Sequence, residues 1–194
     1  MPPVRAYLRA RWDRGLLASE CEDAAQEVFL RCFTEAGPLD RLERVSEGGF
    51  RGFLYGVTRN VAREVEQERS RRRHDGSGLE DVEAQDARLS TVFDRSFARQ
   101  VMREARARFE ERMQGGDEDS RFRLEILRLR FDEDLPVREI AQRGGREAAR
   151  VHKEYARARR EFREALFEVV GEQDPRRTDS EVEESARRLI QLLG

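Results

Sequence analysis

Residues 135–170 read LPVREIAQRGGREAARVHKEYARARREFREALFEVV, which is two helical patterns separated by a pair of glycines. Pro136 stands in the first turn of the shorter pattern, where its missing N–H leaves no hydrogen bond unmade. Gly144 and Gly145 suit a tight turn, because glycine adopts positive φ without a steric penalty. In the longer pattern, apolar residues recur at helical spacing from Val151 to Val169. This order predicts a helix-turn-helix, although an ordinary helical hairpin with a charged outer face fits the residues equally well.

The second helix of this pattern would carry charged side chains on the side away from its apolar stripe. Arginine binds guanine edges or phosphates, and glutamate accepts a hydrogen bond from cytosine, so such a face suits a DNA groove. The candidates for this face are Arg146, Glu147, Arg150, Lys153, Glu154 and Arg157.

The rest of the chain also has the composition and periodicity of helices. Arg, Glu, Ala and Leu are abundant, and they are good helix formers. We expect an all-α protein made of two small helical domains. Further helices are expected over 4–17, 20–36, 49–73, 91–114 and 120–131, with a last helix capped by Thr178, Asp179 or Ser180.

Composition and charge limit the class of protein. Hydrophobic residues make up 38% of the chain, which favours two small cores over one large core. The formal net charge of −2 argues against a uniformly basic nucleic-acid binder. The net charge is +2 over residues 1–73, −5 over 74–119, +3 over 120–171 and −2 over 172–194. Each positive block could present a face to phosphates, while solvated helix faces are the simpler explanation of the charge alone.

Several kinds of site lack their residues here. Cys21 and Cys32 lie about three turns apart in one expected helix, too far to bridge, so we expect reduced structural cysteines. No long apolar run and no apolar leader occur, so we expect a cytoplasmic protein with no membrane span. The only histidines are His74 and His152, and no P-loop, G-x-S-x-G or H-E-x-x-H motif occurs. We therefore expect no enzyme, no catalytic residue, no metal site and no cofactor.

Two segments nearer the N-terminus carry side chains suited to recognition. Residues 22–30, EDAAQEVFL, place Asp23, Gln26, Glu27 and Leu30 on the outer face of a helix, which by itself indicates only amphipathicity. Residues 50–60, FRGFLYGVTRN, mix aromatic rings with Arg and Asn, and aromatic platforms beside arginine suit unstacked bases. Phe50 and Phe53 are explained as well by a core position, and Tyr55 and Arg59 share one face.

In this order the three segments resemble the extracytoplasmic-function branch of the sigma-70 family. The family pattern is a D-x-x-Q-E-x-F helix, F-R-x-W-L-Y-x-x-x-R-N, a linker, L-x-x-R-E-I-A, a glycine turn and V-x-x-x-x-x-R-A-R. The matching stretches are Asp23–Phe29, Phe50–Asn60, Leu135–Ala141 and Val151–Arg159. The resemblance covers roughly residues 4–170 and implies a sigma2-like three-helix bundle and a sigma4-like helix-turn-helix bundle.

The resemblance also implies partners and roles. The partners would be core RNA polymerase and promoter DNA, and it leaves open whether an anti-sigma factor binds. The residues implied to dock on polymerase are Asp23, Gln26, Glu27 and Leu30. Those implied to melt and read the minus-ten element are Arg51, Tyr55, Arg59, Asn60, Arg63 and Arg69. Those implied to read the minus-thirty-five element are Arg146, Glu147, Arg150, Lys153 and Arg157. The implied parts are a first domain over 1–73, an acidic linker over 74–90, a helix-turn-helix domain over 91–171 and an extension with an amphipathic helix over 172–194.

The chain departs from the family pattern at three places. Phe53 replaces the usual Trp, and Glu64, Glu66 and Glu68 precede the basic run 69–73. Arg143 and Arg146 stand where members have apolar residues, so either the turn packs differently or these arginines extend towards DNA. Two other classes remain open: a helix-turn-helix regulator that does not need polymerase, and a helical protein-interaction module.

Overall fold

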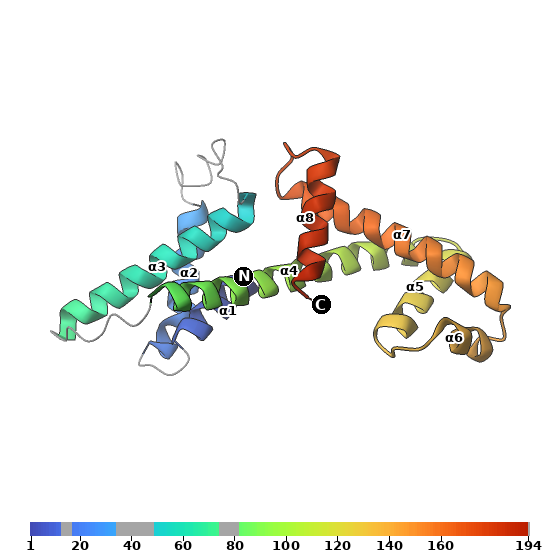
Figure 1. The fold of residues 1–194 in the computed structure, drawn as a ribbon, viewed down its shortest axis with the longest axis horizontal. Helices are drawn as coiled ribbons and strands as arrows, with labels where there is room; N and C mark the ends of the chain where they lie inside the picture. The colour runs from blue at the N-terminus through green and yellow to red at the C-terminus, as the bar shows by residue number, and fades with distance from the viewer. Residues whose placement is uncertain (13–16, 34–48, 74–81, 194) are drawn as a thin grey trace. The chain divides into compact units, whose positions relative to one another are not determined.

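We analysed a computed structural model that describes residues 1–12, 17–33, 49–73 and 82–193 (Figure 1). The fold is all-helical, as the sequence predicts, with no strand in those ranges. The helices are α1 (Pro2–Trp12), the short 3-10 helix η1 (Ala18–Glu20), α2 (Cys21–Phe33), α3 (Gly49–Arg73), α4 (Val82–Gln114), α5 (Glu118–Phe131), α6 (Val137–Arg143), α7 (Ala148–Glu172) and α8 (Asp179–Gln191). None of the helices described is long and apolar enough to cross a membrane.

The chain divides into two compact units, residues 1–100 with 187–194 and residues 101–186. The sequence predicts a linker over 74–90, whereas α4 begins at Val82 and residues 82–90 are helical. The helix extends further because this stretch has neither Gly nor Pro and because Leu89 and Phe93 are buried. Residues 74–81, the rest of the predicted linker, lie outside the described residues.

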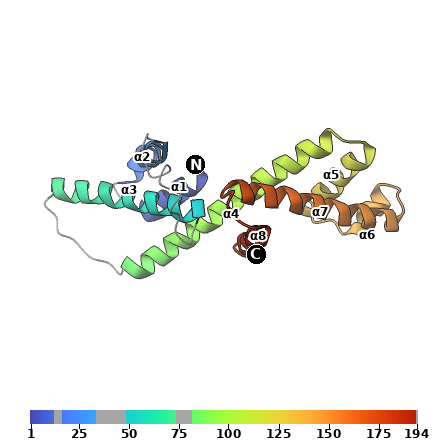
Figure 2. The same cartoon turned by 90° about the horizontal axis from the view of Figure 1, so that it is seen from above.

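In the first unit, α1, α2 and α3 lie against one another in both views (Figures 1 and 2). Their apolar stripes meet in a core that includes Tyr7, Leu8, Val28 and Leu54. Tyr55 lies between two other rings, with its centroid 5.7 Å from that of Tyr7 and 5.4 Å from that of Phe93. The first half of α4 therefore contributes to the same core as α1 and α3.

Both cysteines belong to this core. Cys21 and Cys32 are buried and free, as the sequence predicts. Burial raises the pKa of both thiols, because it disfavours the thiolate. Neither thiol is therefore activated, and both act as small apolar side chains.

In the second unit, α5 and α6 lie against α7 (Figures 1 and 2). One buried cluster joins α4, α5 and α7, and a second joins α5 and α6 to the start of α7. The α8 helix begins with a reciprocal cap: Thr178 N donates to Glu181 Oε2 at 2.8 Å, and Glu181 N donates to Thr178 Oγ1 at 3.4 Å. The predicted cap at Thr178 is confirmed.

Candidate functional site

The turn between α6 and α7 has the geometry that its two glycines predict. Gly144 N donates to Ile140 O at 3.0 Å, and Arg146 N donates to Ala141 O at 3.0 Å. Gly145 has φ of +57°, a conformation that strains any residue with a Cβ. These bonds close α6 in a left-handed C-cap and start α7 three residues later, at Ala148. The predicted order of short helix, glycine turn and long helix is confirmed.

A compact apolar cluster of α5, α6 and α7 packs beneath this turn, on the side away from solvent. Ile140 and Ala141 of α6 and Val151 of α7 are buried together with Phe122 and Ile126 of α5. Val151 is completely buried. The start of α7 is thereby held on a rigid base, which a helix needs if its outer residues are to enter a DNA groove in one register.

Three of the predicted minus-thirty-five residues lie at the exposed start of α7. Glu147 is the residue before the helix, and Arg150 and Lys153 follow on it, all exposed. Arg150 Nη2 lies 2.8 Å from Asp119 Oδ1, and about half of the Arg150 side chain is exposed. Such an open ion pair exchanges readily for another anion, so Arg150 and Lys153 remain available to phosphates or bases.

Arg146 and Arg157 are less exposed than the other members of this set. The guanidinium carbon of Arg146 lies 4.1 Å from the centroid of the Phe122 ring. This contact explains how an arginine can stand at a position where the pattern described above has an apolar residue. The side chain of Arg146 covers the aromatic core, as an apolar residue would. Arg143, in contrast, is exposed and lies 3.4 Å from Glu133. Arg157 Nη1 lies 3.1 Å from Glu154 Oε1.

The sequence-based placement of Glu154 on the outer face is wrong. Glu154 is only 4% exposed. Its Oε2 lies 3.1 Å from Nη1 of Arg123 on α5. Arg123 Nε also lies 2.9 Å from Glu161 Oε2, close enough for an ion pair but without hydrogen-bond geometry. Glu154 is inside because it neutralises an arginine that is itself largely buried.

The predicted polymerase-docking residues lie on α2. Asp23, Gln26 and Leu30 are exposed, and 60% of the Leu30 surface is open to solvent. Glu27 is half-buried, since it accepts a hydrogen bond from Arg31 Nε at 2.6 Å. Arg31 Nη2 also lies 2.7 Å from Glu64 of α3 and lowers the pKa of that carboxyl group below its ordinary value. Asp23, Gln26 and Leu30 therefore form an open face, and Glu27 lies at its edge.

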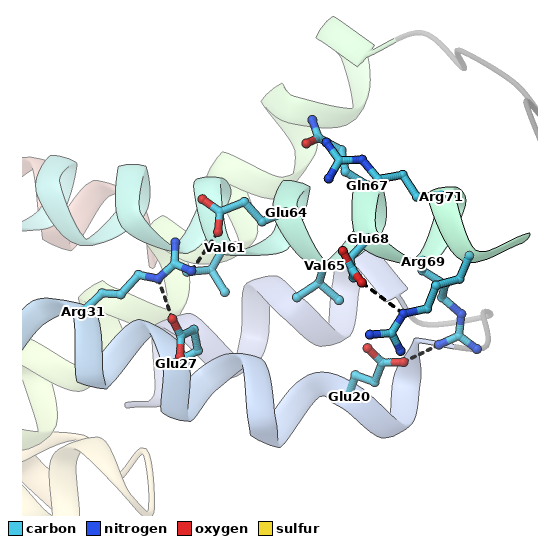
Figure 3. A pocket seen from close by; sticks show the side chains of 11 residues that line it. Glu20, Glu27, Arg31, Val61, Glu64, Val65, Gln67, Glu68, Arg69 and Arg71 are labelled. Carbon is cyan, nitrogen blue, oxygen red and sulfur yellow. Dashed lines mark hydrogen bonds and ion pairs between the residues drawn. The ribbon is translucent and has the colours of Figure 1, made fainter. Parts of the chain in front are cut away.

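A polar cleft of about 820 Å³ opens between α2 and the second half of α3 (Figure 3). Figure 3 shows Arg31 between Glu27 and Glu64, and Glu20 beside Arg69. Glu68, on the same wall, pairs with Arg72. Arg69, a predicted minus-ten residue, is thus paired with η1 at the far end of α3. Opposite charges alternate along the walls of the cleft, so its geometry does not select an anionic or a cationic ligand.

The three glutamates that interrupt the family pattern on α3 all have partners. Glu64 pairs with Arg31, and Glu68 lies 3.0 Å from Arg72. Glu66 accepts two hydrogen bonds from Arg11, at 2.6 and 2.8 Å, and one from Trp12 Nε1 at 2.9 Å. Glu64 and Glu66 thus join α3 to α2 and α1, whereas Glu68 pairs within α3, and the charge of all three is compensated within the unit.

The structure brings four of the predicted minus-ten residues together and leaves two apart. Arg51, Tyr55, Arg59 and Arg63 all face the first half of α4. Arg51 Nε and Nη2 donate to the two carboxylate oxygens of Asp94 at 2.8 and 2.7 Å. Arg59 forms an ion pair with Asp86, and Arg63 Nη2 lies 3.5 Å from the same carboxylate. Asn60 is exposed, and Arg69 lies in the cleft of Figure 3.

Asp86 and Asp94 are the residues that the sequence analysis missed. They lie eight positions apart on α4, and Ser90 lies midway, so the three share one face at helical spacing. The negative charge of 74–119 was a usable signal. The sequence did not reveal that this acidic face contacts α3, because charge and spacing do not tell which helix an acidic face packs against.

Comparisons of the chain with protein-family models, with curated proteins and with solved structures return no significant match.

Proposed function

We propose that this chain is a promoter-specificity factor of the extracytoplasmic-function sigma type, which binds core RNA polymerase in the cytoplasm and catalyses no reaction itself. The observation that supports it most is that each unit presents an exposed face at the expected place. In the first unit this face is Asp23, Gln26 and Leu30 of α2, and in the second it is Glu147, Arg150 and Lys153 of α7.

The two faces have chemistry suited to different partners. The α2 face combines a carboxylate, an amide and the exposed side chains of Phe29 and Leu30, which suits a protein surface better than a phosphate. The α7 face carries Arg and Lys at the start of a helix that rests on a rigid base, which suits the major groove. On α3, Arg51, Tyr55 and Arg59 would meet the minus-ten strand.

The deciding experiment is retention of tagged full-length protein on core RNA polymerase, followed by run-off transcription from bound genomic fragments. We expect stoichiometric retention and defined transcripts. The variant Gln26→Ala/Glu27→Ala should lose polymerase binding while its circular dichroism spectrum stays helical. Glu22→Gln, on the same helix but paired with Arg5 at 2.8 Å, is the matched control and should bind normally. Absence of binding by the unmodified chain would reject the proposal.

A regulator that binds DNA without polymerase is the second candidate. One observation favours it: the α3 arginines are paired within the unit, as they would be in a helix that serves only as scaffold. Such a protein would bind duplex DNA alone, with an affinity that falls steeply as salt rises, and would not be retained on polymerase. A protein-interaction module would show neither property.

A further inference from the structure

We propose that the first half of α4 is an internal competitor for DNA, with Asp86 and Asp94 occupying the guanidinium groups that would otherwise bind backbone phosphates. This inference rests on the proposed function of α3 as the minus-ten surface, and it concerns the regulation of that surface. In the free chain, α4 covers the arginine face of α3. This face becomes accessible to DNA when the first half of α4 moves away from α3.

The contacts carry this inference because they involve the arginines of one face. Asp94 is engaged at two points by Arg51, with only 14% of its side chain exposed. Asp86 meets Arg59, Arg63 at 3.5 Å and Arg11 at 3.7 Å, and is 18% exposed. Two carboxylates from one helix thus engage three of the four arginines predicted to bind the minus-ten strand.

The chemistry of the pairs is that of phosphate binding. A guanidinium fork binds the two oxygens of a carboxylate or of a phosphate in the same planar, two-point geometry. Arg51 and Arg59 are eight residues apart on α3, as Asp94 and Asp86 are on α4, so the anions are spaced about 12 Å apart along each helix. The arginine face of α3 therefore already binds two carboxylates, one at each end of this interval.

The closed arrangement also leaves one donor unmet. Arg59 Nε is buried and has no hydrogen-bond partner in the described structure. Asp86 is shared among three guanidinium groups, and none of its contacts reaches Arg59 Nε. A chain of phosphates offers more acceptors, and exchange of Asp86 for phosphate would relieve this deficit.

Apolar contacts also hold α4 against α3. Leu89 and Phe93 of α4 are buried, and Phe93 packs edge-on against Tyr55 at 5.4 Å. Moving α4 away would expose these side chains, so the ion pairs and the apolar contacts together hold the face closed against DNA. Core polymerase, by binding the first unit, would supply the compensating contacts, and Tyr55 would become available for stacking on a base only in that state.

The test measures binding of a fluorescein-labelled single-stranded DNA 20-mer of mixed sequence to the full-length chain at low salt. Asp86→Asn/Asp94→Asn removes both charges at nearly constant volume. We expect it to bind at least about tenfold more tightly than the unmodified chain, with a steeper salt dependence. Asp132→Asn is the matched control, because Asp132 has the same two-point pairing with Arg106 at 2.8 and 2.7 Å in the other unit. The Asp132→Asn variant should leave the affinity for single-stranded DNA unchanged.

Two further variants keep the outcome decisive. Arg51→Ala/Arg59→Ala in the double-Asn background should abolish the gain, since it removes the face that was uncovered. Asp94→Asn alone should give a smaller gain in the same direction, and it decides the matter if the double variant does not fold. A folded variant with unchanged DNA affinity would overturn the proposal and leave Asp86 and Asp94 as structural ion pairs. Polymerase retention of the unmodified chain tests the proposed function separately.

Discussion

Arg146 lies over the ring of Phe122, with its guanidinium carbon 4.1 Å from the ring centroid. The two residues come from the turn before α7 and from α5, so the contact joins the predicted recognition helix to the core beneath it. Only 29% of the Arg146 side chain is exposed. Arg146 is therefore a packing residue as well as a candidate DNA contact.

We expect Arg146→Ala to lower the free energy of unfolding by about 1 kcal/mol, the usual contribution of a partly buried cation–π contact. Arg146→Lys should retain part of it. The check is urea denaturation followed by circular dichroism at 222 nm, with Arg143→Ala as the exposed control expected to remain within about 0.5 kcal/mol of the unmodified chain. Equal stability of the Arg146→Ala and Arg143→Ala variants would show that the ring contact contributes nothing.

Arg150 should behave in the opposite way, because it is more exposed and its contact with Asp119 is open to solvent. If α7 reads DNA as proposed, Arg150→Ala weakens binding of the polymerase-bound protein to a selected promoter duplex by about 1–3 kcal/mol and leaves stability unchanged. Asp119→Asn, which frees the guanidinium, should not weaken binding. An unaltered affinity in Arg150→Ala would remove Arg150 from the recognition set.

The order of the helices could be read from the sequence because it depends on local signals. Gly144 and Gly145 mark the turn, and the stripe that starts at Val151 marks the helix after it. The cap at Thr178 was equally local. These features need only neighbouring residues, so periodicity and turn chemistry were sufficient.

The side-chain environment depended on tertiary partners and was harder to predict. Val151, Glu154 and Ala158 follow the spacing of one helical face, so periodicity alone would have placed Glu154 inside. Its charge argued for the outside, and the buried partner Arg123 was not visible in the sequence. The same limit hid the pairing of Arg51 with Asp94, since the two lie 43 residues apart on different helices.

Glu154 offers a large and specific effect on stability. Glu154→Ala would leave Arg123, which is 12% exposed, without its principal partner. We expect a loss of about 3 kcal/mol in the free energy of unfolding, at the lower end for breaking a buried ion pair, because Glu161 remains nearby. Glu147→Ala, an exposed glutamate before the same helix, is the control. A loss under about 1 kcal/mol by denaturant titration would mean that Glu161 replaces Glu154 fully.

Acid should destabilise the chain through carboxylates that arginines hold ionised. Arg108 lies 2.9 Å from Glu172 and lowers the pKa of Glu172 below its ordinary value of 4.5. Arg106 likewise lowers the pKa of Asp132 below 3.8, through a hydrogen bond to its carboxylate. A carboxyl group whose pKa is lower in the folded state binds fewer protons there than in the unfolded chain. Its contribution is complete above the unfolded pKa and is lost as the pH falls through the folded one.

We therefore expect the melting temperature to fall progressively below about pH 4.5. Glu172→Gln should flatten this fall, because the glutamine cannot titrate. Arg108→Gln should flatten it as well, since the carboxyl group then loses the partner that lowers its pKa. Melting curves of both variants at closely spaced pH values provide the check. If the melting temperatures of both variants fall below pH 4.5 as steeply as that of the unmodified chain, the Arg108–Glu172 pair does not persist in solution.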